Sequence, residues 1–145
     1  MVHPIDSKRQ KIAKKLTKGN DNWLTIKAYS TTAECIEGLK ADGRAIWATD
    51  LSQDSVSLEE EGFEVPDKIA VVVGNETDGV STEMLEAAEK RIFLPIHGFS
   101  ESLNLSVASA LVLQRIFYLC PKARGNLTEA EKKTIRADWY LKLSK

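Results

Sequence analysis

The side chains best suited to chemistry in this 145-residue sequence lie in two short loops. The first loop, residues 74–79 (GNETDG), has a glycine at each end and carries Glu76. The second loop starts at Pro95 and ends near Ser102 and Asn104. A carboxylate, a hydroxyl and an amide can orient a bound ligand or share a proton with it. Neither loop ends in the Gly-Lys-Ser/Thr sequence that cradles phosphate, so the pattern disfavours a nucleotide-phosphate site.

Four elements are expected to position these loops. Residues 69–73 (IAVVV) are mostly β-branched, which is typical of a strand buried on both faces. The pattern further predicts a short helix over 82–90, a small strand over 92–94 and a long apolar helix over 104–119. Each loop therefore follows a strand and precedes a helix. Such loops form a ligand crevice at one edge of an α/β sheet.

The upstream chain repeats the same alternation of elements. Residues 23–29 (WLTIKAY) alternate in polarity and predict a strand. Thr31 opens a capping box, which predicts a helix that Gly43 would end. Residues 45–49 predict a further strand, and residues 54–67 predict a loop with one short helical turn. Because strand, helix and strand recur, the expected fold class is α/β, with a mostly parallel sheet flanked by helices.

The two ends of the chain differ in character. Residues 1–18 are basic, and they form either a phosphate-binding edge or a solvated terminal arm. Residues 19–145 contain no Pro/Gly/Ser linker, so they are expected to form one domain. A second capping box at Thr128 predicts a C-terminal helix over about 128–143. Its apolar stripe must bury against the domain or against a second copy.

Composition narrows the possible partners. The formal net charge of −1 gives no overall attraction to nucleic acid. Cys35 and Cys120 lack the spacing of a metal site and are expected to be free thiols, so no metal is expected. The N-terminus has no apolar stretch of the secretory kind. The longest apolar run, 103–120, is interrupted by polar residues, so we expect a cytoplasmic chain without a membrane span.

The two loops also carry a family resemblance. GNETDG after an apolar strand, and LPIHGFSESLNLSVASALVL after it, are similar to the second and third motifs of the SpoU/TrmH branch of SPOUT methyltransferases. The resemblance implies an RNA 2′-O-ribose methyltransferase that acts on tRNA or rRNA with S-adenosyl-L-methionine as methyl donor. It also implies the α/β knot (trefoil-knot) fold, with the knot over about 69–119, and a homodimer.

The resemblance assigns roles to individual residues. Glu76, Ser102 and Asn104 match polar positions of the family motifs, which implies a catalytic role. The implied cofactor-binding residues are Thr49, Gly74, Asn75, Leu94, Ile96 and Leu103.

Structural alternatives stay open for several of these residues. The three apolar positions 94, 96 and 103 could be core residues, and Ser102 and Asn104 could be helix N-caps. A glycine at position 74 would let a ligand approach the backbone closely. The family varies at His97, so the resemblance gives that histidine no role.

The resemblance covers about residues 19–119 and lacks the family's first motif, which supplies an arginine. Arg9 has neither the preceding strand nor the asparagine of that motif. The sequence therefore resembles an N-terminally truncated family member. The alternative is a catalytically inactive module that binds the cofactor or RNA.

Overall fold

The computed structural model describes residues 23–60, 62–75, 77–97, 103–125 and 127–144. The chain forms two compact units. The first unit spans residues 31–124. The second contains the described parts of residues 2–30 and 125–145.

The first unit is built on a four-stranded sheet in the order β2-β4-β1-β3. The strands are β1 (Ala45–Thr49), β2 (Val56–Ser57), β3 (Ile69–Val72) and β4 (Lys90–Phe93). Every pairing is parallel: β1 lies between β3 and β4, and β2 extends the sheet beyond β4. The parallel sheet confirms the predicted α/β class, and β1 has the predicted bounds.

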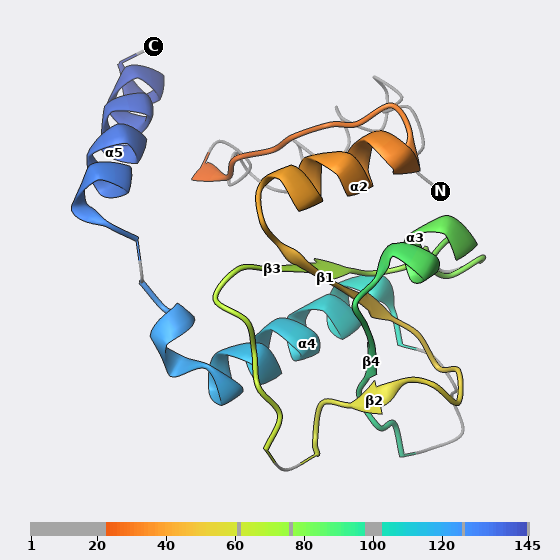
Figure 1. Cartoon of the computed structure of the whole chain (residues 1–145). Coiled ribbons are helices and arrows are strands. Elements are labelled where there is room, and N and C mark those ends of the chain that lie inside the picture. The colour runs from red at the N-terminus through yellow and green to blue at the C-terminus, as the bar shows by residue number, and fades with distance from the viewer. Residues whose placement is uncertain (1–22, 61, 76, 98–102, 126, 145) are drawn as a thin grey trace. The chain divides into compact units, whose positions relative to one another are not determined.

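Helices cover both faces of this sheet (Figure 1). On one face, α2 (Thr32–Ala41) and α3 (Thr82–Ala87) pack Ile36 and Met84 against Ile46 of β1. On the other face, α4 (Leu105–Leu119) packs against the sheet through an apolar cluster. That cluster contains Trp47, Leu58, Ile92, Val112 and Ile116. The result is a three-layer arrangement in which β1 is buried from both sides.

The helix ends follow the sequence signals. The Thr31 side chain caps α2 by accepting a hydrogen bond from the Glu34 amide at 3.1 Å. Gly43 lies just beyond the C-cap Asp42 with φ of 67°, a conformation that favours glycine. At the start of α4, the Asn104 side chain accepts from the Ser106 amide at 2.9 Å. These caps fix where each helix begins or ends relative to the strands.

Three predictions for the first half of the chain were wrong. Residues 23–29 do not form a strand, because none of the described strands pairs with them and Leu24 and Ile26 are exposed. The predicted loop 54–67 contains β2, which is only two residues long and gives no local signal. The strand β3 is only half-buried, because it lies at an edge of the sheet rather than in its centre.

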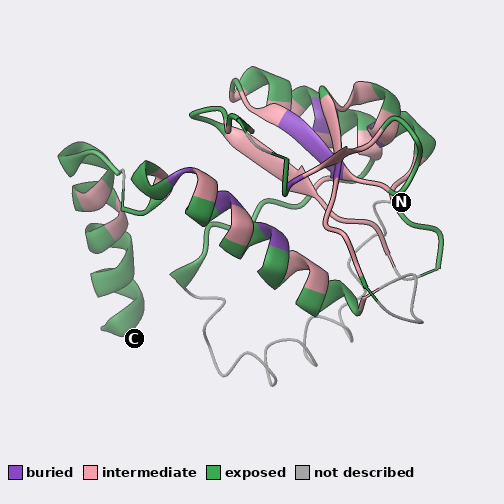
Figure 2. Cartoon of the chain, turned by 90° about the horizontal axis from the view of Figure 1, so that it is seen from below, coloured by how far each residue is buried: buried purple, intermediate pink, exposed green. Residues whose placement is uncertain are grey.

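Helix α4 is covered on one side only (Figure 2). Val112 and Ile116 are the residues of this helix that are buried. The opposite positions are apolar and exposed, including Val107, Leu111 and Leu113. Within the first unit, the described residues therefore supply no neighbour on the outer face of the helix.

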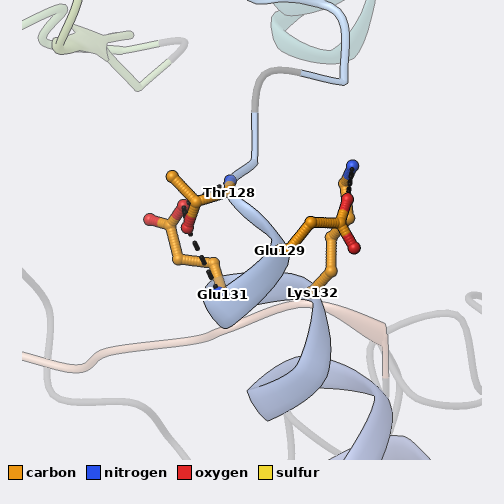
Figure 3. A network of polar contacts seen from close by, with 4 residues as sticks. All are labelled: Thr128, Glu129, Glu131 and Lys132. Carbon is orange, nitrogen blue, oxygen red and sulfur yellow. Dashed lines mark hydrogen bonds and ion pairs between the residues drawn. The ribbon is translucent and has the colours of Figure 1, made fainter.

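The second unit combines the segment after residue 22 with α5 (Glu129–Leu143). Its helix begins with the predicted capping box, in which Thr128 and Glu131 bond each other's backbone N–H groups (Figure 3). Trp23 and Trp139 meet edge to face, with ring centroids 5.3 Å apart. Such pairs contribute about 0.5–1.5 kcal/mol beyond the burial of their area. Of the helices described in either unit, none is both long and apolar enough to cross a bilayer.

Candidate functional site

A cavity of about 480 Å³ lies where β1, β3 and β4 end. Its wall comes from residues at or after the carboxyl ends of these strands and from the first turns of α4. Open parallel sheets bind ligands at this edge. The cavity is lined by Thr49, Asp50, Leu51, Val73, Gly74, Asn75, Asp78, Gly79, Val80, Leu85, Ile92, Phe93, Leu94, Ile96, Leu103, Leu105, Ala108 and Val112.

All six residues expected to bind a cofactor line this one cavity. Thr49 ends β1, Gly74 and Asn75 follow β3, and Leu94 and Ile96 follow β4. Leu103 precedes the N-cap of α4 and completes the set. The structure thus brings together residues that lie up to 54 positions apart in the sequence (103 − 49 = 54). Their ligand role stays a prediction.

Position 74 needs glycine for a reason that the sequence did not indicate. A Cβ atom at this position would lie 2.2 Å from the carbonyl carbon of Gly79 and 2.5 Å from the amide nitrogen of Val80. The close approach expected for a ligand is therefore made by the loop's own backbone. Gly79 has φ of 67°, which lets the loop turn back onto position 74.

Asn75 holds this loop closed. Its side-chain Oδ1 accepts hydrogen bonds from the amides of Thr77 at 2.8 Å and Asp78 at 2.7 Å. Its backbone exchanges two hydrogen bonds with Gly79, both 3.1 Å long. The loop is thus fixed by its own contacts, and its backbone forms a rigid part of the cavity wall.

The end of β1 carries a carboxylate in a fixed orientation. The Asp50 amide donates to the Ile92 carbonyl at 3.0 Å, which ties this residue to β4. One carboxylate oxygen accepts from the Leu51 amide at 3.0 Å, and the other accepts from the Ser52 hydroxyl at 2.6 Å. The Arg91 guanidinium lies 3.7 Å from the second oxygen. Asp50 thus belongs to the cavity wall, and its negative charge is partly balanced by one cation.

The rest of the wall is largely apolar. Leu94, Ile96 and Leu103 face the same space as Ala108 and Val112 of α4. Apolar walls with a few fixed polar groups are typical of sites for small organic ligands. The alternative of core packing is compatible with this placement, since Leu94 also packs against the core cluster of α4.

The residues expected to be catalytic are less well defined. Glu76 and Ser102 lie outside the described residues. Asn104 caps α4 through its side chain, as the structural alternative predicted, and it is not among the lining residues. His97 is exposed and is not among them either.

Sequence reasoning missed several lining residues. Asp50 and Leu51 directly follow the predicted strand 45–49, so their position at a strand end was the available signal. Asp78 and Gly79 belong to the glycine-bounded loop itself. No comparable signal exists for Ala108 and Val112, which reach the cavity because α4 crosses beneath the sheet.

A second depression, of about 570 Å³, lies at the opposite edge of the sheet. Its lining residues lie between α2 and β1 and just before β3. Most of them are charged, including Lys40, Arg44, Asp67 and Lys68. Among the described residues, none that is expected to bind or react lines this depression. The first cavity is therefore the candidate site, although it is the smaller of the two.

The fold and the cavity define an α/β protein with a ligand crevice at the carboxyl edge of a parallel sheet. The sequence pattern of the SpoU rRNA Methylase family matches residues 1–114, and the chain belongs to that family. This match also includes residues 1–18, which the resemblance to the two motifs did not cover.

Curated relatives support the same membership. The tRNA (guanosine(18)-2'-O)-methyltransferase of Borreliella burgdorferi is 33% identical over 99% of this chain and 66% of its own length. The protein of the same name from Aquifex aeolicus is 37% identical over 74% of this chain and 50% of its own length. The chain thus spans about half to two thirds of the length of these relatives.

Solved structures agree with the fold. The A. aeolicus TrmH/SpoU tRNA modifying enzyme matches with a TM-score of 0.71 and 32% identity, over 89% of this chain and 67% of that one. An AdoMet-bound rRNA methyltransferase from Sinorhizobium meliloti matches with a TM-score of 0.55 and 26% identity. That match covers 61% of this chain and 33% of the other.

Proposed function

We propose that this chain binds S-adenosyl-L-methionine in the cavity and transfers its methyl group to a ribose 2′-hydroxyl of tRNA or rRNA. The observation that carries the proposal is the meeting of Thr49, Gly74, Asn75, Leu94, Ile96 and Leu103 around one cavity. The names of the curated relatives favour guanosine 18 of tRNA as the first nucleotide to test. The S. meliloti neighbour, which holds AdoMet, supports the choice of cofactor.

The cavity chemistry suits this ligand. S-adenosyl-L-methionine combines a flat, neutral adenosine with a flexible charged tail. The apolar side chains of Leu94, Ile96 and Leu103 can cover the base, and backbone groups of Asn75 and Gly79 can read its polar edge. The sulfonium already activates the methyl group, so the remaining task is to hold the carbon in line with the ribose oxygen and to take up the hydroxyl proton.

Glu76, Ser102 and Asn104 are the proposed catalytic residues by family resemblance. A described contribution comes from Asn104, whose cap fixes the start of α4 beside the cavity. A capped helix N-terminus is also a fixed polar platform for a neighbouring group. In this proposal Asn104 positions the start of α4 beside the cavity.

The test is methyl transfer to a defined RNA. Purified protein is incubated with methyl-labelled S-adenosyl-L-methionine and an unmodified tRNA transcript. The control is the same transcript with a 2′-deoxyguanosine at position 18. Label in the first RNA but not in the second supports the proposal at that nucleotide. A rRNA transcript tests the other substrate class, and no label in any RNA contradicts the activity.

A second candidate function is a binding module without turnover. One observation favours it: the described residues that line the cavity include no arginine, lysine or histidine to help the hydroxyl proton leave. Calorimetry together with the methyl-transfer assay separates the two candidates. A module binds S-adenosyl-L-methionine or tRNA with measurable heat but transfers no methyl group, whereas an enzyme does both.

The proposal includes a homodimer that covers α4. The exposed apolar side chains of this helix, among them Val107, Leu111 and Leu113, would then be buried against a second copy. Leu111→Glu should convert a dimer to a monomer in light scattering. The control is Thr82→Glu on α3, which adds the same charge on the other face of the sheet. A dimer that survives Leu111→Glu contradicts this interface.

The same proposal includes four further features of the family. These are a trefoil knot over about 69–119, a single methyltransferase domain over 19–145, a basic arm over 1–18 and a cytoplasmic location. They are supported by the family membership of the chain. A cytoplasmic location would put the chain where its proposed RNA substrates are. An experimental backbone trace through the segment between β4 and α4 would test the knot.

A further inference from the structure

The charged side chains around the cavity have one sign. Among the described lining residues, Asp50 and Asp78 carry carboxylates and none carries a cation. Asp78 is exposed, whereas the side chain of Asp50 is only 22% exposed. A partly buried carboxylate acts through a lower effective dielectric than an exposed one, so Asp50 dominates the field in the cavity.

Asp50 cannot easily turn away from this position. Its two carboxylate oxygens are held by the Leu51 amide and the Ser52 hydroxyl, and its backbone amide is bonded to β4. The one described cation that pairs with it is Arg91, at 3.7 Å with a side chain 31% exposed. Asp50 is among the residues that line the cavity, whereas Arg91 is not.

Methyl transfer changes the charge of the ligand that this field acts on. The S–CH₃ bond breaks and its electron pair stays on sulfur, while a new C–O bond forms to the ribose and the hydroxyl proton leaves. The donor carries a positive sulfonium, and the product S-adenosylhomocysteine carries an uncharged thioether. The rest of the two molecules is the same, so their affinities differ mainly through this one charge.

We infer that Asp50 is a specificity-determining residue that favours the charged methyl donor over its uncharged product. The inference rests on the proposed cofactor site and adds to it a residue that the family motifs did not indicate. Arg91 tunes the preference in the opposite direction, since it partly neutralises the carboxylate. The field of Asp50 thus assists exchange of spent product for fresh donor.

The size of the effect follows from Coulomb's law. For two unit charges about 8 Å apart, at an effective dielectric constant of about 40, the attraction corresponds to about a fivefold change in affinity. Asp50→Asn keeps the size of the side chain and its acceptor oxygen, and it removes the charge. It should weaken S-adenosyl-L-methionine about fivefold and S-adenosylhomocysteine less than about twofold. Arg91→Gln should instead strengthen the donor relative to the product.

The experiment is calorimetric titration of the full chain with both ligands. A third ligand, sinefungin, has a protonated amine in place of the sulfonium and should follow the donor. Asp67→Asn is the matched control, because it removes the same charge at the opposite edge of the sheet. The donor preference should also shrink as salt rises from about 50 to 500 mM.

The possible outcomes separate the inference from the function. A donor-to-product affinity ratio that falls in Asp50→Asn, rises in Arg91→Gln and is unchanged in Asp67→Asn supports the inference. Equal weakening of both ligands in Asp50→Asn would mean that the carboxylate bonds a group common to both, and it overturns the charge preference alone. A wild-type chain that binds neither ligand overturns the proposed cofactor site as well.

Discussion

Replacing Gly74 by alanine tests whether the closed 74–79 loop forms the cavity. The new Cβ would lie 2.2–2.5 Å from backbone atoms of Gly79 and Val80, closer than any real Cβ contact. Because the obstructing atoms are backbone, no rotation of a side chain relieves the clash. The loop must open, and the paired hydrogen bonds between Asn75 and Gly79 are then lost.

The magnitude can be worked from these bonds. Two backbone hydrogen bonds at about 1 kcal/mol each give a cost of about 2 kcal/mol for closing the loop. If the ligand binds only the closed loop, its affinity falls about thirtyfold. Because the opening is local, we expect the affinity to suffer more than the global free energy of unfolding.

The assay compares Gly74→Ala with Gly43→Ala. Gly43 also has a special backbone, with φ of 67°, but a Cβ there meets no atom within 4 Å. Its alanine variant should lower the free energy of unfolding by about 1 kcal/mol through left-handed strain. It should leave the affinity unchanged, because it lies beside the opposite edge of the sheet. Calorimetry with S-adenosyl-L-methionine and urea denaturation measure the two quantities separately.

One result would refute the reasoning. If Gly74→Ala binds the cofactor with wild-type affinity while the Asn75 and Gly79 amides lose protection from hydrogen exchange, the closed loop is not needed for binding. If the amides also keep their protection, the clash itself is absorbed without opening the loop. Either outcome removes the rigid loop from the description of the site.

Three further predictions concern single side chains. Asn104→Ala should lower the free energy of unfolding by about 1 kcal/mol, because the N-cap of α4 is lost. Asn104→Asp should retain the cap and the stability. Loss of methyl transfer in this stable variant would indicate a chemical role for the amide. Thr128→Ala should shorten α5 and cost about 1 kcal/mol of helix stability. Hydrogen exchange should then show weaker protection of the amides in the first turn of α5. Unchanged protection would contradict the capping box. The hydrogen bond from Lys122 lowers the pKa of Asp67, so its contribution to stability is present above the unfolded-state pKa and is lost as pH falls through the folded-state value. Lys122→Gln should return that pKa towards its ordinary range in an NMR titration, and no change would remove the ion pair as its cause.

The sequence predicted the centre of the fold well because the signals there are local. The strand 45–49 is apolar and bounded by turn residues, and the caps at Thr31, Asn104 and Thr128 are short side-chain-to-backbone contacts. The resemblance to the family motifs selected the six cavity residues, and the parallel strands bring them together because such strands share one carboxyl edge. These features depend on neighbours within a few residues or on a general property of the sheet.

Features that depend on distant neighbours were not predicted. Strand β2 exists because its two residues pair with β4, and Leu58 after it is held by the Phe93 carbonyl and by Arg115 of α4. The segment 23–29 has the alternation of a strand but finds no strand partner among the described residues. Nothing within a few positions of either segment reveals these partners.

The orientation of the charged side chain of Asp50 in the candidate site also depends on a residue that is distant in the sequence. Asp50 follows a well-predicted strand, but its orientation depends on Ser52 and on Arg91, which lies about 40 positions later. Gly74 was expected to let a ligand approach the backbone closely, whereas the atoms that approach it in the structure are the loop's own backbone. The sequence positions of these residues thus indicated where the cavity lies. They indicated less well what each residue does there.

The edge-to-face contact of Trp23 with Trp139 has a consequence for biosynthesis. Its two rings are synthesised at well-separated times, since more than a hundred residues lie between them. All strands of the described sheet are synthesised before α5. The sheet can therefore begin to assemble before α5 emerges, whereas the segment around Trp23 stays without its aromatic neighbour until that helix has been made.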